Sequence, residues 1–233
     1  MGNVWPPSTF LGQLRPDTAE AVLEIGTPVI YPAHRWILRQ GEEGSHVILL
    51  VSGFVKVLLN AETGYEMLAA VRVGGDLVGE MAAFESRPRS GSVIACGEVR
   101  ARVVQREALE QFLAARPDAL RGVIRMLSAR LRWANQRRVE FQAYDAETRL
   151  ARVLVELSHS YGLTEPGRPR SVLALTLTQS ELASLAGLKL ATAEKALAGL
   201  TRIGLVERNY RSVTVNDVPR LMQFAHVDPQ NPY

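Results

Sequence analysis

Short runs of apolar residues, separated by glycines, fill the region from about residue 28 to residue 104. Six of these runs are expected to form strands: residues 47–51, 54–58, 67–73, 77–78, 92–95 and 99–104. Many short strands with glycine turns between them are typical of an antiparallel barrel or sandwich. Because no long helical pattern alternates with these strands, a parallel α/β sheet is not expected.

A second pattern, with apolar residues every three or four positions, begins at Asp118 and ends near Tyr144. Its repeating positions are Leu120, Ile124, Leu127, Leu131, Ala134, Arg138 and Phe141. These alternating steps form a heptad seam, which predicts a helix of about 25 residues that pairs with a second copy of the chain. The alternative is a single amphipathic helix that packs on its own barrel. The charge of Arg138 on this seam needs a partner or an exit to solvent.

From Ala146 onward the pattern is again helical, with a short strand pair near the end. We expect helices over residues 148–161, 179–186 and 190–203, a loop over residues 162–171 and a hairpin over residues 205–215. Thr178 and Glu181 have the spacing of a capping box at the start of the second of these helices. Two short helices joined around Gly187 and followed by a hairpin predict a winged helix-turn-helix. The alternative is an ordinary helical hairpin whose lysines are merely solvated.

The second helix of a helix-turn-helix enters the major groove of DNA with its N-terminal face. The candidate groove contacts on that face are Lys189, Leu190, Ala191, Thr192, Glu194 and Lys195. Further DNA contacts are expected from Thr178, Gln179, Arg202, Arg208, Asn209 and Arg211. Among these, the arginines could hold phosphates, where basic side chains release counterions.

The chemically richest part of the strand region runs from Val78 to Ser90. Gly79 would let a ligand approach the backbone, and Glu80, with Met81 beside it, could accept a hydrogen bond from a ribose hydroxyl. Arg89 could grip a phosphate as a forked donor, with Ser90 adding its hydroxyl. The alternative is a strand turn with an exposed salt bridge from Glu80 to Arg87 or Arg89. No nucleophile with a neighbouring base and no phosphate-cradling glycine loop is evident, so no catalytic residues and no enzyme are expected.

Composition narrows these possibilities. The 233 residues, 47% hydrophobic and 22% charged, suit a globular chain of one large or two small domains. A single cysteine, Cys96, excludes a disulfide framework, a four-cysteine zinc site and a cysteine-ligated iron–sulfur cluster, and no metal site is expected. This cysteine usage fits a reducing compartment. No secretory signal and no apolar run long enough to span a bilayer is evident, so we expect a cytoplasmic protein with no membrane partner.

The net charge of +3 hides an asymmetry along the chain. Residues 1–114 sum to −3, residues 115–145 to +4 and residues 146–233 to +2. An acidic first part and a basic remainder indicate separate tasks, with the basic part facing DNA. The alternative is a solubilising surface whose charge is uneven.

Over roughly residues 10–225 the chain resembles the cyclic-AMP receptor protein/FNR (CRP/FNR) family of bacterial transcription regulators. The resemblance is carried by Gly41-Glu42, Val51-Ser52-Gly53, the run from Gly74 to Glu80, the Arg89-Ser90 pair, the long helix and the helix-turn-helix. It implies an α+β fold: a cyclic-nucleotide-binding β-roll over residues 1–114, a dimerisation helix and hinge over residues 115–145, and a winged helix-turn-helix over residues 146–233.

The same resemblance implies a ligand and partners. Glu80 would take the ribose 2′-hydroxyl, Arg89 and Ser90 the cyclic phosphate, and Gly79 would supply a backbone contact. No tightly bound cofactor is implied; cAMP or another cyclic nucleotide would act as effector. The implied partners are a double-stranded DNA operator, a second copy of the chain and RNA polymerase.

Two departures from the family pattern affect these expectations. Cyclic-AMP-responsive members place a threonine on the long helix to meet the adenine, where this chain has Ala134 followed by Asn135, so base recognition is weakened or passes to Asn135 or Arg138. Members that read the TGTGA half-site carry arginine and glutamate where Leu190 and Ala191 stand, and arginine where Lys195 stands. We therefore expect a different operator, read by apolar contact, by Lys189, Thr192 and Lys195, and by DNA shape.

The signal also has alternatives. The protein could be a regulator of the same fold that needs no ligand, or one that responds to cyclic GMP or a cyclic dinucleotide. The iron–sulfur branch of the family is excluded because Cys96 stands alone.

Overall fold

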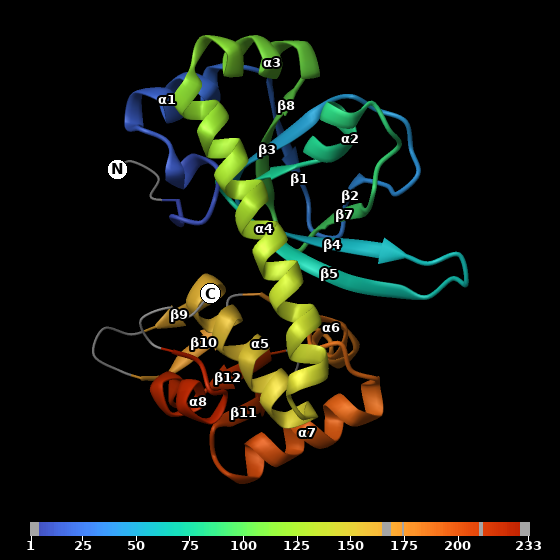
Figure 1. Ribbon diagram of the computed structural model, residues 1–233, viewed down its shortest axis with the longest axis vertical. Helices are drawn as coiled ribbons and strands as arrows, with labels where there is room; N and C mark the ends of the chain where they lie inside the picture. Colours follow the sequence, from blue (N-terminus) through green and yellow to red (C-terminus); the bar gives the residue numbers. More distant parts are fainter. Residues whose placement is uncertain (1–4, 165–168, 174, 210–211, 229–233) are drawn as a thin grey trace. The chain divides into compact units, whose positions relative to one another are not determined.

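The computed structural model describes residues 5–164, 169–173, 175–209 and 212–228 (Figure 1). The chain divides into two compact units, Met1–Arg132 and Trp133–Tyr233, which are described in turn. The division falls within one long helix, so each unit contains part of that helix. None of the helices in the described part of the chain is long and apolar enough to cross a membrane.

Two antiparallel four-stranded sheets form the centre of the first unit. One has the order β1-β8-β3-β6 and the other the order β2-β7-β4-β5. The strands are β1 (Thr27–Tyr31), β2 (Trp36–Leu38), β3 (Val47–Ser52), β4 (Phe54–Asn60), β5 (Glu66–Val73), β6 (Leu77–Val78), β7 (Ser92–Ala95) and β8 (Val99–Val104). All six strands expected from the apolar runs are present, with ends within one or two residues of the expected ones.

The helices of the first unit are η1 (Leu11–Gln13), α1 (Pro16–Glu24), α2 (Glu80–Glu85), α3 (Arg106–Ala115) and the first part of α4 (Pro117–Ala143). The long helix predicted from Asp118 to about Tyr144 is therefore present, shifted by one residue at each end. Figure 1 shows α1, α3 and the beginning of α4 gathered at one end of the sheets.

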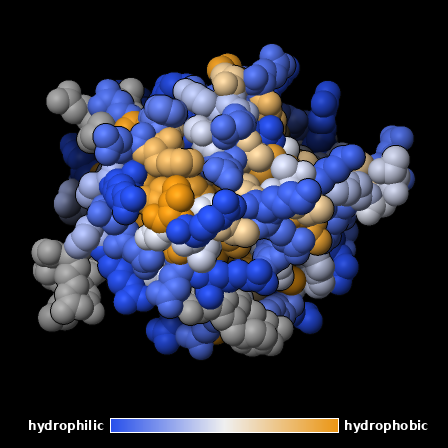
Figure 2. Space-filling view, turned by 90° about the horizontal axis from the view of Figure 1, so that it is seen from below, coloured by the Kyte–Doolittle hydropathy of each residue, from blue (hydrophilic) through white to orange (hydrophobic). Residues whose placement is uncertain are grey.

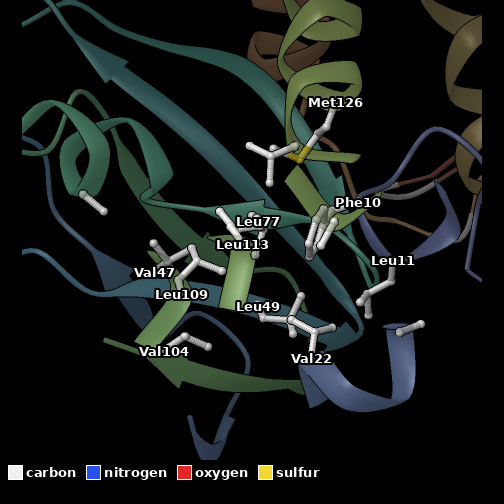
Figure 3. Close-up of a cluster of buried hydrophobic side chains, with 14 residues drawn as sticks. Phe10, Leu11, Val22, Val47, Leu49, Leu77, Val104, Leu109, Leu113 and Met126 are labelled. Carbon is white, nitrogen blue, oxygen red and sulfur yellow. The ribbon is translucent and has the colours of Figure 1, made fainter. Parts of the chain in front are cut away.

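Strand β3 explains why its sequence is a continuous apolar run. Successive side chains of a strand point to opposite faces, so Val47 and Leu49 face one side and Ile48 and Leu50 the other. Val47 and Leu49 belong to a core shared with α1, α3 and α4, seen in Figure 3. Ile48 and Leu50 belong to a second core with side chains from both sheets. A strand that is buried on both faces is apolar at successive positions and lacks the alternation of apolar and polar residues.

The second unit is built on α5 (Ala146–Tyr161), which buries Leu150, Val153, Leu154 and Leu157. Its other helices are α6 (Gln179–Leu185), α7 (Leu190–Arg202) and α8 (Val218–Phe224). A four-stranded sheet has the order β11-β12-β10-β9, from β9 (Gly162–Thr164), β10 (Ser171–Leu173), β11 (Val206–Asn209) and β12 (Ser212–Val215). The hairpin expected after the second short helix is β11 and β12.

The loop predicted over residues 162–171 is wrong at both of its ends. Strand β9 follows α5 directly and pairs with β10, with Val172 opposite Leu163. The Pro166-Gly167 pair that indicated a loop lies outside the described residues, between these two strands. The strands are three residues long, too short to show a periodic pattern in the sequence. They extend the expected hairpin into a sheet.

Candidate functional site

Arg89 is a buried cation held by main-chain oxygens. It follows α2 and precedes β7, and only 4% of it is exposed. Its Nη1 donates to the carbonyl oxygen of Gly79 and its Nη2 to that of His46, both at 2.8 Å. Its own backbone is paired with the loop before β3, through Glu42 and Gly41. Burial lowers the pKa of Arg89, and the negative charges of Glu42 and Glu80 act in the opposite sense.

This arrangement suits the binding of an anion. Arginine stays protonated at any physiological pH, so the guanidinium is a fixed buried charge. Both of its backbone acceptors are neutral, and a neutral carbonyl satisfies a hydrogen bond without cancelling the charge. A phosphate oxygen is a stronger partner for a guanidinium, because charge-assisted hydrogen bonds are about twice as strong as neutral ones.

Gly79 has to be a glycine for two reasons. Its φ is +81°, in the left-handed region that side chains disfavour. A Cβ at this position would also lie 2.6 Å from Arg89 Nη1 and 2.8 Å from Leu38 Cδ1. The group that approaches the Gly79 backbone in this structure is the Arg89 side chain, and the approach of a ligand there stays a prediction.

Glu80 is the first residue of α2 and is 5% exposed. Its Oε1 accepts from Nη1 of Arg130 at 2.6 Å, and Nη2 of the same arginine donates to Asp76 Oδ1 at 3.2 Å and to the Leu77 carbonyl at 2.8 Å. The alternative of an exposed salt bridge from Glu80 to Arg87 or Arg89 is therefore wrong. The partner is Arg130 on α4, and the pair joins a buried carboxylate to a half-buried guanidinium.

Met81 and Ser90 lie close to this pair but are themselves exposed. Ser90 Oγ donates to Met81 Sδ at 3.8 Å, so the two side chains meet. Ala134 and Asn135, the expected base contacts, are exposed on the part of α4 that belongs to the second unit. The structure thus brings together Gly79, Glu80 and Arg89, with Met81 and Ser90 beside them.

Helix α4 has one face in the core and one in solvent. Ala119, Val123 and Met126 are buried against α1, α3 and β3. The predicted seam lies one position later on the helix than this buried face. Its residues Leu120, Ile124 and Leu131 are 45%, 54% and 63% exposed. Ala134 and Arg138 are also exposed, and Leu127 is half-buried. One face of α4 therefore packs on its own unit, as in the alternative to a paired helix. The seam face is left exposed.

Phe141, the last seam position, has a partner within its own unit. A Cβ on Gly187 would lie 2.6 Å from Phe141 Cε1, so the ring rests on the turn between α6 and α7. The guanidinium of Arg149 lies 5.1 Å from the centre of the same ring and donates from Nε to the Ala186 carbonyl at 3.0 Å. These contacts join the end of α4 to the helix-turn-helix.

Helices α6 and α7 form the predicted helix-turn-helix. The capping box is confirmed: the Thr178 backbone donates to Glu181 Oε2 at 2.7 Å, and the Glu181 backbone donates to Thr178 Oγ1 at 3.2 Å. The two helices share a small core of buried side chains, with Leu188 half-buried beside it: Leu182, Ala183, Leu185, Ala193, Ala196, Leu197 and Leu200.

The expected DNA-reading face of α7 is in solvent. All six candidate groove contacts are exposed: Lys189, Leu190, Ala191, Thr192, Glu194 and Lys195. Arg202 and Arg208 are exposed as well, Asn209 ends β11, and Arg211 lies outside the described residues. Leu190, an apolar side chain on this face, is 46% exposed. The view from below in Figure 2 shows a group of hydrophobic residues surrounded by mostly hydrophilic ones.

Gln179 connects the two helices to the strand that follows them. In the amide orientation that satisfies its neighbours, its nitrogen donates to Glu194 Oε1 at 2.7 Å and its oxygen accepts from Arg208 Nη1 at 3.0 Å. Arg208 and Glu194 are therefore held on one surface with Gln179. A carboxylate and a guanidinium in fixed positions can contact a base edge and a phosphate.

A buried ionic cluster, missed from the sequence, lies where α4 meets α5. Glu140, 1% exposed, accepts from Arg137 Nη1 at 2.7 Å and from Arg152 Nε at 2.8 Å. Arg137 also pairs with Glu156, which accepts from Trp133 Nε1 at 2.7 Å. Arg152 donates to the carbonyl of Ala225, just after α8. Charged residues spaced three or four apart predict surface ion pairs, so no sequence signal marked this cluster as buried.

Comparison with known proteins identifies two domain families in the chain. Residues 28–116 match the cyclic nucleotide-binding domain family and residues 148–224 the Crp-like helix-turn-helix domain family. The chain is 32% identical over 212 residues to the CRP-like cAMP-activated global transcriptional regulator of Mycobacterium tuberculosis, covering 91% of this chain and 94% of that protein.

Solved structures show the same fold. A CRP/FNR-family transcriptional regulator from Thermus thermophilus superposes with a TM-score of 0.72 at 24% identity, covering 86% of this chain and 98% of that one. The c-di-GMP responsive global regulator CLP of Xanthomonas campestris superposes with a TM-score of 0.70 at 24% identity, covering 86% of this chain and 99% of that one. With both domain families in the expected order, the chain belongs to the CRP/FNR family of transcription regulators, which are ligand-controlled DNA-binding proteins and not enzymes.

Proposed function

We propose that the protein is a homodimeric transcription regulator whose affinity for DNA is controlled by cAMP bound in the first unit. The observation that carries this proposal is the buried guanidinium of Arg89, held by two carbonyl oxygens beside the buried carboxylate of Glu80. A guanidinium binds phosphate oxygens as a forked donor, and a carboxylate accepts from a sugar hydroxyl. The Mycobacterium tuberculosis relative is named as cAMP-activated, which favours cAMP among the cyclic nucleotides.

The residue roles follow the same chemistry. Arg89 and Ser90 bind the cyclic phosphate, Glu80 binds the ribose 2′-hydroxyl, and Gly79 and Met81 line the approach. Arg130 fixes the Glu80 carboxylate through their 2.6 Å hydrogen bond. Ala134 offers the purine base no hydrogen-bonding group, so base selectivity differs from that of relatives with a threonine there and falls to neighbours such as Asn135 or Arg138.

The uncovered face of α4 supports the dimer. Leu120, Ile124 and Leu131 form an exposed apolar stripe at heptad spacing, which is the pattern of a helix that pairs with a second copy. In a two-fold dimer, two α7 helices read half-sites about 34 Å apart, one turn of DNA. Residues 1–114 then sense the ligand, residues 115–145 carry the dimer contact and residues 146–233 read DNA. Binding to bacterial DNA would place the protein in the cytoplasm.

Ligand binding is tested by isothermal titration calorimetry with cAMP, cyclic GMP and c-di-GMP. We expect cAMP to bind, and Arg89→Leu to abolish binding because the phosphate loses its buried cation. Arg87→Leu is the matched control, since Arg87 is exposed two residues away. Unchanged cAMP affinity in Arg89→Leu, or no binding of cAMP to the wild type, would refute the proposed site.

DNA reading is tested by selecting bound sequences from random duplex DNA with and without cAMP. We expect a two-fold symmetric site that is enriched only with cAMP, because a ligand shifts an equilibrium by its difference in affinity for the two states. Enrichment that is the same in both conditions would contradict control by cAMP. Sedimentation at micromolar concentration is expected to give a dimer, and a monomer there would contradict the pairing of α4.

A further inference from the structure

His46 lies immediately before β3, and both its main chain and its side chain face Arg89. Its carbonyl oxygen accepts from Arg89 Nη2 at 2.8 Å, and its ring nitrogen Nδ1 is 3.3 Å from the same Nη2. A guanidinium nitrogen can only donate, so Nδ1 in this contact is the acceptor of a neutral imidazole. The imidazole therefore lies against the cation that we propose binds the ligand's phosphate.

The surroundings of His46 favour this neutral form before a ligand binds. Burial, and then the positive charge of Arg89, lower the pKa of His46 below its ordinary value. Glu42 and Glu80 are the acidic groups that act on Arg89. Glu80 is already bonded to Arg130, so much of its charge is balanced.

We propose that His46 is a second, proton-dependent cation of the anion site, which takes up a proton when a cyclic phosphate binds to Arg89. This inference rests on the proposed function, because it needs a cyclic nucleotide at Arg89. It adds to the proposed site a residue that the sequence did not identify as a ligand contact, and it makes the affinity for the ligand depend on pH. The phosphate of a cyclic nucleotide is a monoanion throughout the neutral range, so the ligand itself does not titrate there.

The physical reason is that a bound phosphate offsets the positive charge that faces His46. Before binding, a proton on His46 would face the Arg89 cation at the distance of a hydrogen bond, which is unfavourable. A bound phosphate adds a negative charge beside Arg89 and offsets that repulsion. The imidazolium then donates to the anion or to solvent, and the pKa of His46 rises. The proton comes from solvent, so binding is coupled to proton uptake.

The sign of the pH dependence follows from this coupling. A group whose pKa rises on binding makes the ligand bind more tightly as the pH falls through the bound-state pKa. The gain is at most tenfold per pH unit for one proton, and it levels off below the pKa of the ligand-free state. We therefore expect cAMP affinity to rise about three- to tenfold between pH 8 and pH 6.

The test is calorimetric titration of full-length protein with cAMP across this pH range, in buffers of different ionisation enthalpy. The difference between the buffers reports the protons taken up, and we expect up to one per site near pH 6. His46→Asn keeps an oxygen at the place of Nδ1 but cannot be protonated, so it should bind cAMP at pH 8 as the wild type does and lose the pH dependence. His34→Asn is the matched control, because His34 is in the same unit and asparagine tolerates its φ of +64°.

The outcomes separate this inference from the proposed function. Wild-type affinity that does not change with pH, or a pH dependence that survives in His46→Asn, would overturn the role of His46 and leave the cAMP site intact. If His46→Asn loses affinity for cAMP at pH 8, His46 acts only as a neutral acceptor that positions Arg89. That result would also overturn the proposed proton uptake by His46. Absence of cAMP binding at every pH would overturn the proposed function together with this inference.

Discussion

The ionic cluster around Glu140 gives the sharpest prediction of stability. The substitution Glu140→Gln keeps the size of the side chain and removes its charge. In the native protein this carboxylate is 1% exposed and accepts from two arginines that are themselves 6% and 7% exposed, Arg137 and Arg152. After the substitution the two guanidinium charges remain buried, and the new NH₂ group faces a donor instead of an acceptor.

The magnitude follows from this geometry. Removing one partner of a buried ion pair costs about 3–5 kcal/mol, because the remaining charge is left uncompensated. Arg137 keeps a second carboxylate, Glu156, and Arg152 keeps the Ala225 carbonyl, so we expect the lower end, about 3 kcal/mol. For a unit of about 100 residues, 1 kcal/mol moves Tm by about 4–8 °C, so the transition of the second unit should fall by about 12–24 °C.

The assay is differential scanning calorimetry of the full chain, with hydrogen exchange of α5 and α8 to assign the transition. Glu207→Gln is the matched control: the same substitution in the same unit, at an ion pair with Arg170 whose side chains are 52% and 54% exposed. An exposed pair contributes at most about 1 kcal/mol. If Glu140→Gln lowers Tm no more than Glu207→Gln does, the buried cluster does not stabilise the unit and the reasoning fails.

Three further predictions use other features. Gly44→Ala would place a Cβ 3.0 Å from Arg89 Nη2 and should weaken cAMP binding roughly tenfold by calorimetry, whereas Gly97→Ala, with open space at its Cβ, should not. Thr178→Ala should lower the free energy of unfolding, measured in urea, by about 1 kcal/mol, whereas Thr178→Ser should be as stable as the wild type. Equal stability of Thr178→Ala and Thr178→Ser would refute the cap. The hydrogen bond from the Thr148 backbone lowers the pKa of Asp145, so its stabilisation is present above the unfolded pKa and is lost as pH falls through the folded pKa. The stability difference between wild type and Asp145→Asn should shrink on acidification in urea titrations, and a constant difference would contradict this.

The order of elements was predictable because the residues that define it are near neighbours in sequence. Six strands of the first unit could be located from their own apolar runs and glycine turns, and α6 from the local spacing of Thr178 and Glu181. Strands β1, β2, β9 and β10 were not expected from the sequence. On α4 the heptad pattern indicated the exposed seam at Leu120 and Ile124. It did not reveal the buried face one position earlier, at Ala119 and Val123, because apolar residues on adjacent faces give overlapping periods.

The partners of the candidate site were not predictable to the same extent. Gly79, Glu80 and Arg89 could be named from their residue types and spacing. Arg130 and His46 could not, because each meets the site from more than 40 residues away in sequence. Long-range pairing depends on the fold, and a lone arginine on a helix or a lone histidine before a strand carries no local signal for it.

The setting of Arg89 also bears on how such a site changes under mutation. Its acceptors at Gly79 and His46 are carbonyl oxygens, which every amino acid possesses, so no side-chain replacement can delete them. A replacement can only obstruct them, by adding atoms where Gly44 and Gly79 have none. In a saturation scan, the carbonyl contacts that hold Arg89 should therefore survive most replacements of neighbouring side chains, whereas Gly44 and Gly79 should accept only glycine. The position of the guanidinium would then be recorded in the sequence partly by side chains that are missing.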